Sequence, residues 1–456
     1  MISDVVRFRE ELDKANPWWK GGKVPELENR NLIERGLSGL ITEEMGTKRG
    51  IIITGPRRAG KTILMKQTIR KLLEKTETRN MLYYSLDDPT LSLFSDSPVK
   101  DVLDYFLENI AKTGRKFIFL DEVQSAKDWY KWVKSFYDSH DDIKFFLSGS
   151  SSLALQREAN QYLRGRTIDF ELFQLSFAEF LELHGIKTRV AHSMEDYEKI
   201  PGMDFIEMKK LHGKVKEKFN EYLLVGGFPE WSEIRNPERW FMRLVNDIPK
   251  KAIYEDIARL FEIKNPKALE SVLAFIAANQ SRILSYEKIS DVVHVDRNTI
   301  VNYLEYLKAS YIIIEVLKHA GVKEQIKAMK KFLVADQGVR NAILKDYEIR
   351  ENNIGFIIEN VIGVSLFFYC KRRGASLTYL KQNGEIDFIV KNKCEIPIEV
   401  KYKQKIGEKE IHHLSSFIDK NRLPSGIVVT KDILQKKGKI IYIPCWLFLL
   451  MLSNEA

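Results

Sequence analysis

The stretch that decides the fold is Ile51-Ile-Ile-Thr-Gly-Pro-Arg-Arg-Ala-Gly-Lys-Thr62. It fits the pattern G-x-x-x-x-G-K-[ST] and lies between a short apolar run and a helix-forming segment, which is the context that a phosphate-binding loop requires. The glycines let backbone N–H groups surround phosphates at a helix N-terminus, where the helix dipole favours anions. Lys61 can reach the β- and γ-phosphates, and the Thr62 hydroxyl can bind Mg²⁺. We therefore expect a nucleoside triphosphate to bind at Gly55, Pro56, Arg57, Arg58, Ala59, Gly60, Lys61 and Thr62.

Two adjacent carboxylates, Asp121 and Glu122, follow the apolar run Lys116–Leu120. Open α/β sheets bind ligands at the carboxyl ends of their strands, so the run delivers both acids to the phosphate site. Asp121 is expected to hold Mg²⁺ through water, and Glu122 to act as general base on the attacking water. The competing interpretation, an acidic pair that only caps the next helix, is disfavoured by the phosphate-binding loop upstream.

Further residues are candidates for the hydrolytic step. Ser148, or alternatively Ser150, ends another apolar run and is expected to sense the γ-phosphate and position the water, although a plain Ser/Gly turn is also consistent with the pattern. Arg166, or alternatively Arg164, is the candidate arginine finger, acting in cis or from a neighbouring subunit. A finger that acts in trans implies an oligomer. A surface arginine pair is the competing interpretation.

Short apolar runs alternate with helix-length segments between about residues 50 and 172, a pattern typical of a parallel sheet covered by helices on both faces. The runs are Gly50–Thr54, Met81–Ser85, Lys116–Leu120, Lys144–Ser148 and Thr167–Leu172.

Composition restricts the class of protein. A chain of 456 residues is too long for one hydrophobic core. The net charge of +9 is compatible with a polyanionic partner and equally with a solvated basic surface. Cys370, Cys394 and Cys445 show no C-x-x-C spacing, which argues against disulfides and a cysteine zinc site. The longest apolar stretch noted, Ile443–Leu452, is too short to span a bilayer, and no signal peptide is recognised, so we expect a cytoplasmic protein without a membrane partner.

Residues 263–325 contain three helix-length segments and then the β-like run Tyr311–Val316, the order of a winged helix-turn-helix. In the third segment Asp296 is a natural N-cap, and one face is apolar: Ile300, Leu304 and Leu307. The opposite side carries the candidate DNA contacts Arg297, Asn298 and Asn302. Four lysines are expected to add phosphate contacts: Lys323, Lys327, Lys330 and Lys331. A module that packs against the ATPase core without touching DNA is the alternative.

A second carboxylate set lies near the C-terminus. Glu399 and Lys401 alternate on an expected strand and so share one face. If the preceding strand joins it through the turn Asn392-Lys393-Cys394, Lys391 pairs with Glu395, and Asp387 then lies opposite Glu399, within about 5 Å. Such a pair can share Mg²⁺ or Mn²⁺, with Glu359 from the preceding helix as a further ligand. Lys401 would orient the nucleophilic water or stabilise the phosphorane.

In order, these motifs resemble archaeal and bacterial P-loop ATPases, related to AAA+ proteins, that carry a C-terminal domain of uncertain function. The resemblance rests on GPRRAGKT (55–62), YSLDDP (84–89), FLDEVQSAKDW (119–129), SGSSS (148–152), LRGR (163–166), LSFAEF (175–180), YLLVGGFPEW (222–231), KFLVADQGVRN (331–341), GFIIENVIG (355–363), GEIDFIV (384–390) and IPIEVKYK (396–403). It implies ATP rather than GTP, and a sheet with the P-loop strand central. The last motifs resemble the PD-(D/E)XK nuclease core, with Ile386 where proline is usual, and an inactive nuclease fold remains the competing interpretation.

We therefore expect an α/β protein with four domains: a P-loop ATPase core at 1–175, a helical lid or annex at 176–262, a winged-helix module at 263–325 and a restriction-endonuclease-like domain at 326–456. The expected function is hydrolysis of ATP with Mg²⁺, coupled to DNA binding or processing. The alternative is a nucleotide-dependent switch or scaffold that binds a protein partner and has an inactive nuclease-like domain.

Overall fold

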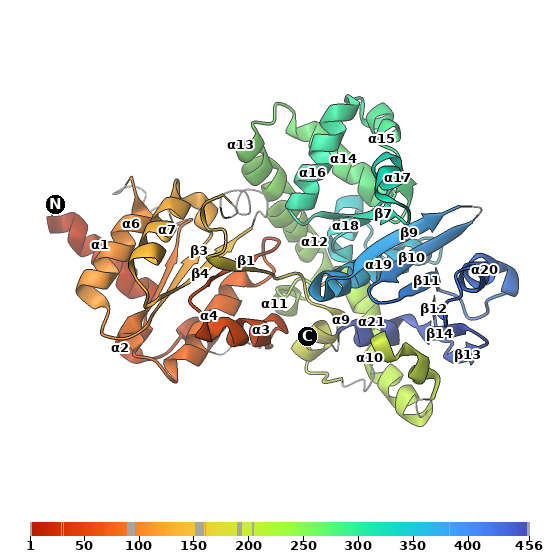
Figure 1. Ribbon diagram of the computed structural model, residues 1–456, viewed down its shortest axis with the longest axis horizontal. Coiled ribbons are helices and arrows are strands. Elements are labelled where there is room, and N and C mark those ends of the chain that lie inside the picture. The colour runs from red at the N-terminus through yellow and green to blue at the C-terminus, as the bar shows by residue number, and fades with distance from the viewer. Residues whose placement is uncertain are drawn as a thin grey trace. The chain divides into compact units, whose positions relative to one another are not determined.

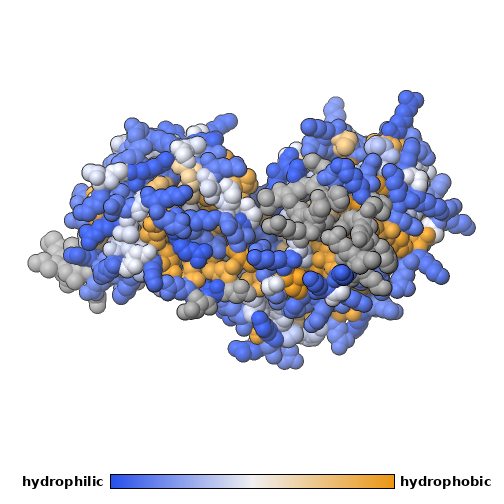
Figure 2. All heavy atoms as spheres, turned by 90° about the horizontal axis from the view of Figure 1, so that it is seen from below, coloured by the Kyte–Doolittle hydropathy of each residue, from blue (hydrophilic) through white to orange (hydrophobic). Residues whose placement is uncertain are grey.

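In a computed structural model the chain forms two compact units, Met1–Phe173 and Gln174–Ala456, whose helices and strands are labelled in Figure 1. Each unit has its own buried core. The structure describes residues 2–28, 30, 32–88, 96–150, 159, 161–188, 194–202, 205–382 and 384–453. The expected helical annex at 176–262 falls in the second unit. The face of the molecule drawn in Figure 2 is mainly hydrophilic, in keeping with a chain in which 30% of the residues are charged.

The first unit contains a parallel five-stranded sheet in the order β2-β3-β4-β1-β5. Its strands are β1 (Gly50–Thr54), β2 (Met81–Ser85), β3 (Lys116–Asp121), β4 (Ile143–Gly149) and β5 (Thr167–Glu171). All five expected runs are confirmed to within one residue at each end. The P-loop strand β1 lies between β4 and β5, so the expectation that it is central was wrong, and β4 is the middle strand.

Helices cover this sheet and complete its core. They are α4 (Lys61–Leu73), α6 (Pro98–Tyr105) and α7 (Trp129–Ser139), and each gives buried apolar side chains to one cluster with the strands. The strands β1 and β4 are buried along their whole length. A strand that is buried on both faces needs a continuous apolar run, which explains the Ile and Phe repeats of the sequence.

The N-terminal segment protects the edge of the sheet at β2. It contains α1 (Ile2–Ala15), α2 (Trp18–Gly21), α3 (Leu37–Glu43) and two short turns, η1 (Pro25–Leu27) and η2 (Glu44–Gly46). The buried Asn16 side chain accepts the Tyr83 N–H at 2.6 Å and donates to the Tyr83 carbonyl at 3.0 Å. The indoles of Trp18 and Trp19 both donate to the Met81 carbonyl. Side chains thus satisfy backbone groups that an edge strand would otherwise expose.

The second unit contains a nine-stranded mixed sheet in the order β13-β14-β12-β11-β10-β9-β7-β8-β6. The strands are β6 (Ile283–Leu284), β7 (Ile313–Lys318), β8 (Lys330–Val334), β9 (Ser376–Lys381), β10 (Glu385–Lys391), β11 (Glu395–Lys401), β12 (Gly426–Thr430), β13 (Gln435–Lys437) and β14 (Ile440–Pro444). The helices before residue 263 are α9 (Phe177–Leu183), η6 (Met194–Gly202), α10 (Phe205–Val225), α11 (Trp231–Ile234), α12 (Pro237–Val245), η7 (Asn246–Lys250), η8 (Ala252–Ile257) and α13 (Ala258–Phe261). The later helices are α14 (Pro266–Ala278), α15 (Tyr286–Val293), α16 (Arg297–Ala309), α17 (Val322–Lys327), α18 (Gln337–Leu344), α19 (Ile354–Arg373), η9 (Glu408–Ile411), α20 (His412–Lys420) and α21 (Cys445–Ser453).

The segment expected to form a winged-helix module runs α14, β6, α15, α16, β7, α17 and β8. Strands β7 and β8 form an antiparallel hairpin, and β6 pairs with β8. The expected domain boundary at 325/326 falls inside this hairpin. Because β7 also pairs in parallel with β9, the hairpin belongs to the same sheet as the C-terminal strands β9–β14.

Helix α19 packs against β8, β9, β10 and β11. Gly363 permits this approach, because a Cβ there would lie 2.5 Å from the Phe388 ring and 2.7 Å from Leu333. The fully buried Asn360 accepts the Val334 N–H and donates to the Val334 carbonyl, which fixes the helix along β8. Among the described residues, α19 is long and apolar enough to cross a membrane by length and composition, and half of it is buried inside the protein.

Candidate active sites

The phosphate-binding loop connects β1 to α4. Gly55 has φ 148°, and a Cβ at this position would lie 2.0 Å from the Leu172 carbonyl oxygen of the chain beside β1. Gly60, the residue before α4, has φ 99°. Glycine is therefore required at Gly55 for close backbone approach and at Gly60 for a left-handed turn into the helix. This geometry explains both glycines of the motif.

Lys61 is only 4% exposed. Its Nζ donates to the carbonyl oxygens of Gly55 at 3.1 Å and Pro56 at 3.0 Å, and it lies 3.9 Å from Glu122 Oε1. The carbonyl groups of the loop therefore hold the Lys61 ammonium group beside the loop backbone, close to the acidic pair Asp121–Glu122. Lys61 begins α4 and Glu122 follows β3, and the fold brings the two together as expected.

Asp121 is the most heavily bonded group of the site. Its Oδ2 accepts hydrogen bonds from the Thr62 hydroxyl at 2.6 Å and the Tyr83 hydroxyl at 2.9 Å, and its Oδ1 accepts one from the Ser148 hydroxyl. Burial, followed by the charge of Asp121, raises the pKa of Tyr83 well above its usual range, so the phenol stays a donor. Thr62 and Asp121, the two groups expected around Mg²⁺, are thus in contact, and the residues present fit this ion.

Glu122 lies directly after β3 with φ 50°. Its backbone N–H donates to Ser148 Oγ at 3.2 Å, and its Oε2 accepts from Gln124 Nε2 at 2.5 Å. Gln124 also contacts Ser150 Oγ at 3.2 Å. Ser148 therefore contacts both acids, whereas Ser150 is connected to Glu122 only through Gln124. Ser151 and Ser152 of the same run lie outside the described residues.

The two candidate finger arginines lie at the other end of the sheet. Thr167, the first residue of β5, pairs with Gly50, the first residue of β1, whereas the phosphate loop follows the last residue of β1. Five strand residues span roughly 16 Å. Arg166 forms a bidentate ion pair with Asp138 (Nε–Oδ1 2.8 Å, Nη2–Oδ2 3.1 Å), which lowers the pKa of Asp138, and Arg164 is exposed. Action on the chain's own triphosphate is therefore not supported, and only action on a neighbouring subunit remains compatible with this position.

Sequence reasoning missed two residues of the nucleotide site, Tyr83 and Arg35. Tyr83 lies in β2 directly opposite Phe119 of β3, and strand alternation could have placed its hydroxyl on the Asp121 side. Arg35 donates to the Ala59 carbonyl at 3.0 Å and to the Phe173 carbonyl at 2.8 Å, so it ties the phosphate loop to the end of the first unit. Nothing local in the sequence distinguishes this arginine from a surface cation.

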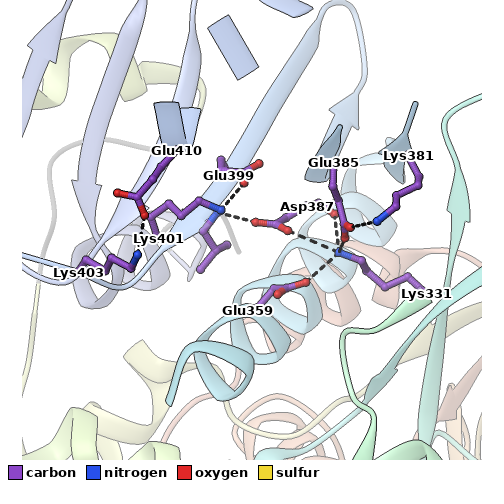
Figure 3. Close-up of polar contacts among 10 residues, drawn as sticks. Lys331, Glu359, Lys381, Glu385, Asp387, Glu399, Lys401, Lys403 and Glu410 are labelled. Carbon is purple, nitrogen blue, oxygen red and sulfur yellow. Dashed lines mark hydrogen bonds and ion pairs between the residues drawn. The ribbon is translucent and has the colours of Figure 1, made fainter. Parts of the chain in front are cut away.

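The second carboxylate set lies on β10 and β11 (Figure 3). The expected register is confirmed, with Lys391 opposite Glu395 and Phe388 opposite Ile398. Asp387 and Glu399 are 7% and 5% exposed. Asp387 Oδ2 accepts the Val400 N–H at 2.8 Å, and Lys401 Nζ donates to Glu399 Oε1 at 2.5 Å. Glu399 Oε2 is buried without a hydrogen-bond partner, which fits a cation at this point.

Lys331 on β8 enters the same centre, which was not expected from the sequence. Its fully buried Nζ lies 2.8 Å from Glu359 Oε1, 3.4 Å from Glu385 Oε1 and 3.7 Å from Asp387 Oδ1 (Figure 3). Lys331 was therefore wrongly expected to contact DNA. Glu359, expected as a further metal ligand beside Asp387 and Glu399, pairs with the Lys331 ammonium in this structure. Among the described residues, no three His, Cys, Asp or Glu side chains form a metal-holding group.

Burial and mutual repulsion shift the titration of this centre. Burial, followed by the charge of Asp387, raises the pKa of Glu399 to about 8 and that of Glu359 to about 7. Burial opposes the charge of Lys331 and Lys401, yet the surrounding carboxylates outweigh it and raise the pKa of both lysines. The centre contains four carboxyl groups, on Glu359, Glu385, Asp387 and Glu399, and two ammonium groups, on Lys331 and Lys401.

On α16, the local expectations for packing are confirmed. Asp296 caps the helix by accepting the Thr299 N–H at 3.0 Å, and the three apolar residues of one face are buried: Ile300, Leu304 and Leu307. The three candidate DNA contacts are exposed: Arg297, Asn298 and Asn302. Arg297 pairs with Glu287 at 2.7 Å. Lys323 and Lys327 are exposed, but Lys330 is buried and donates to the Gln325 carbonyl, so it was wrongly expected to contact phosphate.

Comparison with known proteins connects the first unit with AAA ATPases. Residues 47–181 match the family model of an AAA domain. Residues 216–348 and 354–448 match two separate domains of unknown function. The first unit thus has a P-loop NTPase fold similar to that of AAA domains, a class of ATPases that uses ATP and Mg²⁺.

The curated relatives are similar over most of the chain. An uncharacterised protein of Methanocaldococcus jannaschii is 25% identical over 423 residues, covering 90% of this chain and 86% of the relative. A second protein of that organism is 29% identical over 372 residues, covering 79% and 76%. An uncharacterised protein of Haemophilus influenzae is 27% identical over 359 residues, covering 76% and 80%.

Solved structures are similar at a low level. The ORC2 protein of Aeropyrum pernix in its ADP form gives a TM-score of 0.32 at 12% identity, covering 73% of this chain and 99% of that one. PCH-2 of C. elegans gives a TM-score of 0.25 at 15% identity, covering 61% and 69%.

Proposed function

We propose that this chain is an Mg²⁺-dependent ATP hydrolase whose second unit binds and processes DNA. The contact between the Thr62 hydroxyl and Asp121, 2.6 Å long, carries the nucleotide half of this proposal. It joins a helix N-terminus, a buried carboxylate and the nearby Lys61 in one place, as a bound triphosphate with its metal requires.

Each group of the nucleotide site has one task in the proposed mechanism. The loop amides and Lys61 bind the phosphates, and Thr62 and Asp121 would hold Mg²⁺, which neutralises the charge that develops on the phosphate oxygens. Glu122 accepts the proton of the attacking water. Ser148, bonded to Asp121 and to the Glu122 backbone, positions both acids relative to each other.

The DNA half of the proposal rests on the second unit. A winged helix is supported by the element order α14, β6, α15, α16, β7, β8, with β7 and β8 in an antiparallel hairpin. Helix α16 buries one face and exposes Arg297, Asn298 and Asn302 on the other, as a helix does when it enters the major groove. Lys323 and Lys327, exposed on α17 between the two hairpin strands, can contact the phosphate backbone.

The centre on β10 and β11 is the proposed site of phosphodiester cleavage. Asp387 and Glu399 would hold a divalent Mg²⁺ or Mn²⁺ ion, which acts on the scissile phosphate as a Lewis acid. Lys401, bonded to Glu399, orients the nucleophilic water and balances the charge of the pentavalent phosphate. The unpartnered Glu399 Oε2 is the observation that supports a cation here.

The test combines a gel shift on duplex DNA with an ATP turnover assay. Arg297→Ala should weaken DNA binding by about 1–3 kcal/mol if the arginine reads a base, whereas Arg239→Ala, which removes an exposed arginine of α12, should change it little. Asp387→Ala should abolish any cleavage with Mg²⁺ or Mn²⁺ and leave ATP turnover intact. The proposal fails if the protein neither shifts DNA nor cuts it.

A second candidate function is a nucleotide-dependent switch that binds a protein partner and has no nuclease activity. Helix α17 and the residues after it favour this candidate, because Val322, Ile326 and Met329 are 73%, 72% and 50% exposed. Apolar side chains at this spacing suit a protein surface better than a phosphate backbone. This candidate predicts slow ATP turnover that a protein partner, and not DNA, stimulates.

A further inference from the structure

Lys331 lies outside both sequence motifs of the nuclease-like centre, yet its side chain is the most enclosed group there. It comes from β8 and is 0% exposed. Figure 3 shows its ammonium group among three carboxylates from two other elements: Glu359 of α19, and Glu385 and Asp387 of β10. Fully buried lysines are rare unless they are paired. The partners of Lys331 are acids of the nuclease-like centre, so its burial is connected with the chemistry of that centre.

The surroundings of Lys331 Nζ are those of a bound cation. Besides the three carboxylates, it lies 3.4 Å from the Asp387 backbone oxygen. It also lies over two aromatic rings, 5.1 Å from the centroid of Phe388 and 6.0 Å from that of Tyr379. The ammonium thus contacts Glu359 Oε1 and faces Asp387 Oδ1.

Asp387 Oδ2 and the carboxylate oxygens of Glu399 are acidic oxygens of the centre that do not contact Lys331. Asp387 Oδ2 is next to the Val400 N–H, and Glu399 has one oxygen bonded to Lys401 and one buried oxygen with no partner. In sites with two metals the ions lie about 3.5–4 Å apart and share a carboxylate. If Asp387 bridged two metal ions here, the second ion would bind on its Oδ1 side. The Lys331 ammonium group already occupies that position.

We propose that Lys331 takes the place of a second metal ion, so that the centre binds one divalent cation, at Asp387 and Glu399. Glu359 then serves as the counter-ion of Lys331 and is not a metal ligand. This inference rests on the proposed nuclease-like function of the same centre. It assigns Lys331 as a positioning residue that holds Glu359 and Asp387 from the side opposite the metal.

The test is a count of bound Mn²⁺ on the nucleotide-free full-length protein, by the loss of the free-ion resonance in electron paramagnetic resonance titrations. Wild type should bind one ion, and Asp387→Asn should lose it. Lys331→Met, similar in volume but uncharged, should gain a second ion, because the carboxylates that faced the ammonium become available. Circular dichroism of each variant checks that it is folded.

Glu359→Gln tests the inference even if Lys331→Met does not fold. It should retain the single Mn²⁺ ion with an affinity within about threefold of wild type, since Glu359 is not a ligand. Glu399→Gln, which alters a ligand by the same isosteric change, should weaken the ion by about tenfold or more.

The outcomes separate the two proposals. Two Mn²⁺ ions in wild type, or equal loss of affinity in Glu359→Gln and Glu399→Gln, would overturn the role of Lys331 and leave the metal centre intact. No ion in either wild type or Lys331→Met would contradict the proposed nuclease-like centre itself.

Discussion

Ser148 is the residue that connects the two acids of the nucleotide site. Its hydroxyl bonds Asp121 Oδ1 and accepts the Glu122 N–H. Removing one preorganised hydrogen-bond group from an active site lowers kcat by about 10²-fold. We expect Ser148→Ala to show a loss of this order in steady-state ATP turnover, with a nearly unchanged nucleotide Kd, because Thr62 and Tyr83 still hold Asp121.

Ser150→Ala is the matched control for this prediction. Ser150 bonds Gln124 and neither acid, so its removal should lower kcat by less than about threefold. A Ser148→Ala variant with wild-type turnover, or a larger loss in Ser150→Ala, would show that the roles of the two serines are reversed.

Asp336 is a buried acid that titrates near neutrality. It accepts the N–H groups of Gly227 at 2.8 Å and Val339 at 3.0 Å, yet burial dominates and raises its pKa to about 6 from 3.8. The folded state therefore binds more protons than the unfolded state between roughly pH 4 and pH 6. The contribution of Asp336 to stability is full below this window and is lost as the pH rises through it, by up to about 3 kcal/mol.

The measurement is the apparent unfolding midpoint of wild type and Asp336→Asn between roughly pH 4 and pH 7. The variant lacks this titration, so the stability of wild type relative to the variant should fall as the pH rises and then become constant. A difference that is independent of pH, or one that grows with pH, would contradict the raised pKa.

At the scale of elements, the end of α10 and the start of α18 form a close contact that depends on glycine. A Cβ on Gly338 would lie 2.0 Å from the Val225 carbonyl oxygen, and one on Gly226, at φ 79°, would lie 2.1 Å from Asp336 Oδ1. The Val225 carbonyl, at the end of α10, cannot move without shifting that helix. We therefore expect Gly338→Ala to lower the free energy of unfolding by about 1–3 kcal/mol or more.

Gly213→Ala is the control for this contact. Gly213 is exposed inside α10, and a Cβ there meets nothing within 4 Å. Alanine favours a helix interior by up to about 1 kcal/mol over glycine, so this variant should be slightly more stable than wild type. Equal denaturant midpoints for the two variants would contradict the proposed contact.

The elements differ in how well the sequence predicts them. The five strands of the first unit follow from local apolar runs, and the β10–β11 register follows from the hairpin turn and side-chain alternation. The pairing of β7 with β9 does not, because about sixty residues separate Leu317 from Thr378 and no local signal selects this partner. The position of Lys331 depends on that long-range pairing. From the sequence alone, Lys330 and Lys331 therefore suggested a basic surface, and the buried ion pairs of Lys331 could not be predicted.

At the scale of the whole molecule, the chain leaves the nucleotide-binding unit beside the phosphate loop. The Leu172 N–H donates to the Thr54 carbonyl, and Arg35 bonds both Ala59 and Phe173. Two residues later, the Leu175 N–H donates to the Gly227 carbonyl of the second unit. Leu172 and Phe173, the last residues of the first unit, are therefore bonded to the end of β1 and, through Arg35, to the phosphate-binding loop.

The same scale explains which parts of the site could be predicted. Motif spacing placed Lys61, Thr62, Asp121 and Glu122, because the topology of a parallel sheet brings the ends of its strands to one edge. Motif spacing could not place Arg166, because this arginine precedes β5 and therefore lies at the amino ends of the strands, away from the phosphate-binding loop.

The central claim is that Glu122 is the base of an ATP-hydrolysing site formed with Lys61, Thr62 and Asp121. The most direct measurement pairs calorimetric ATP binding with steady-state ATP turnover for wild type and Glu122→Gln. We expect the variant to bind MgATP within about threefold of wild type and to lose turnover by about 10²-fold or more, because only the proton acceptor has changed. Equal turnover in the two proteins, or no heat from adenine nucleotides with wild type, would contradict the account.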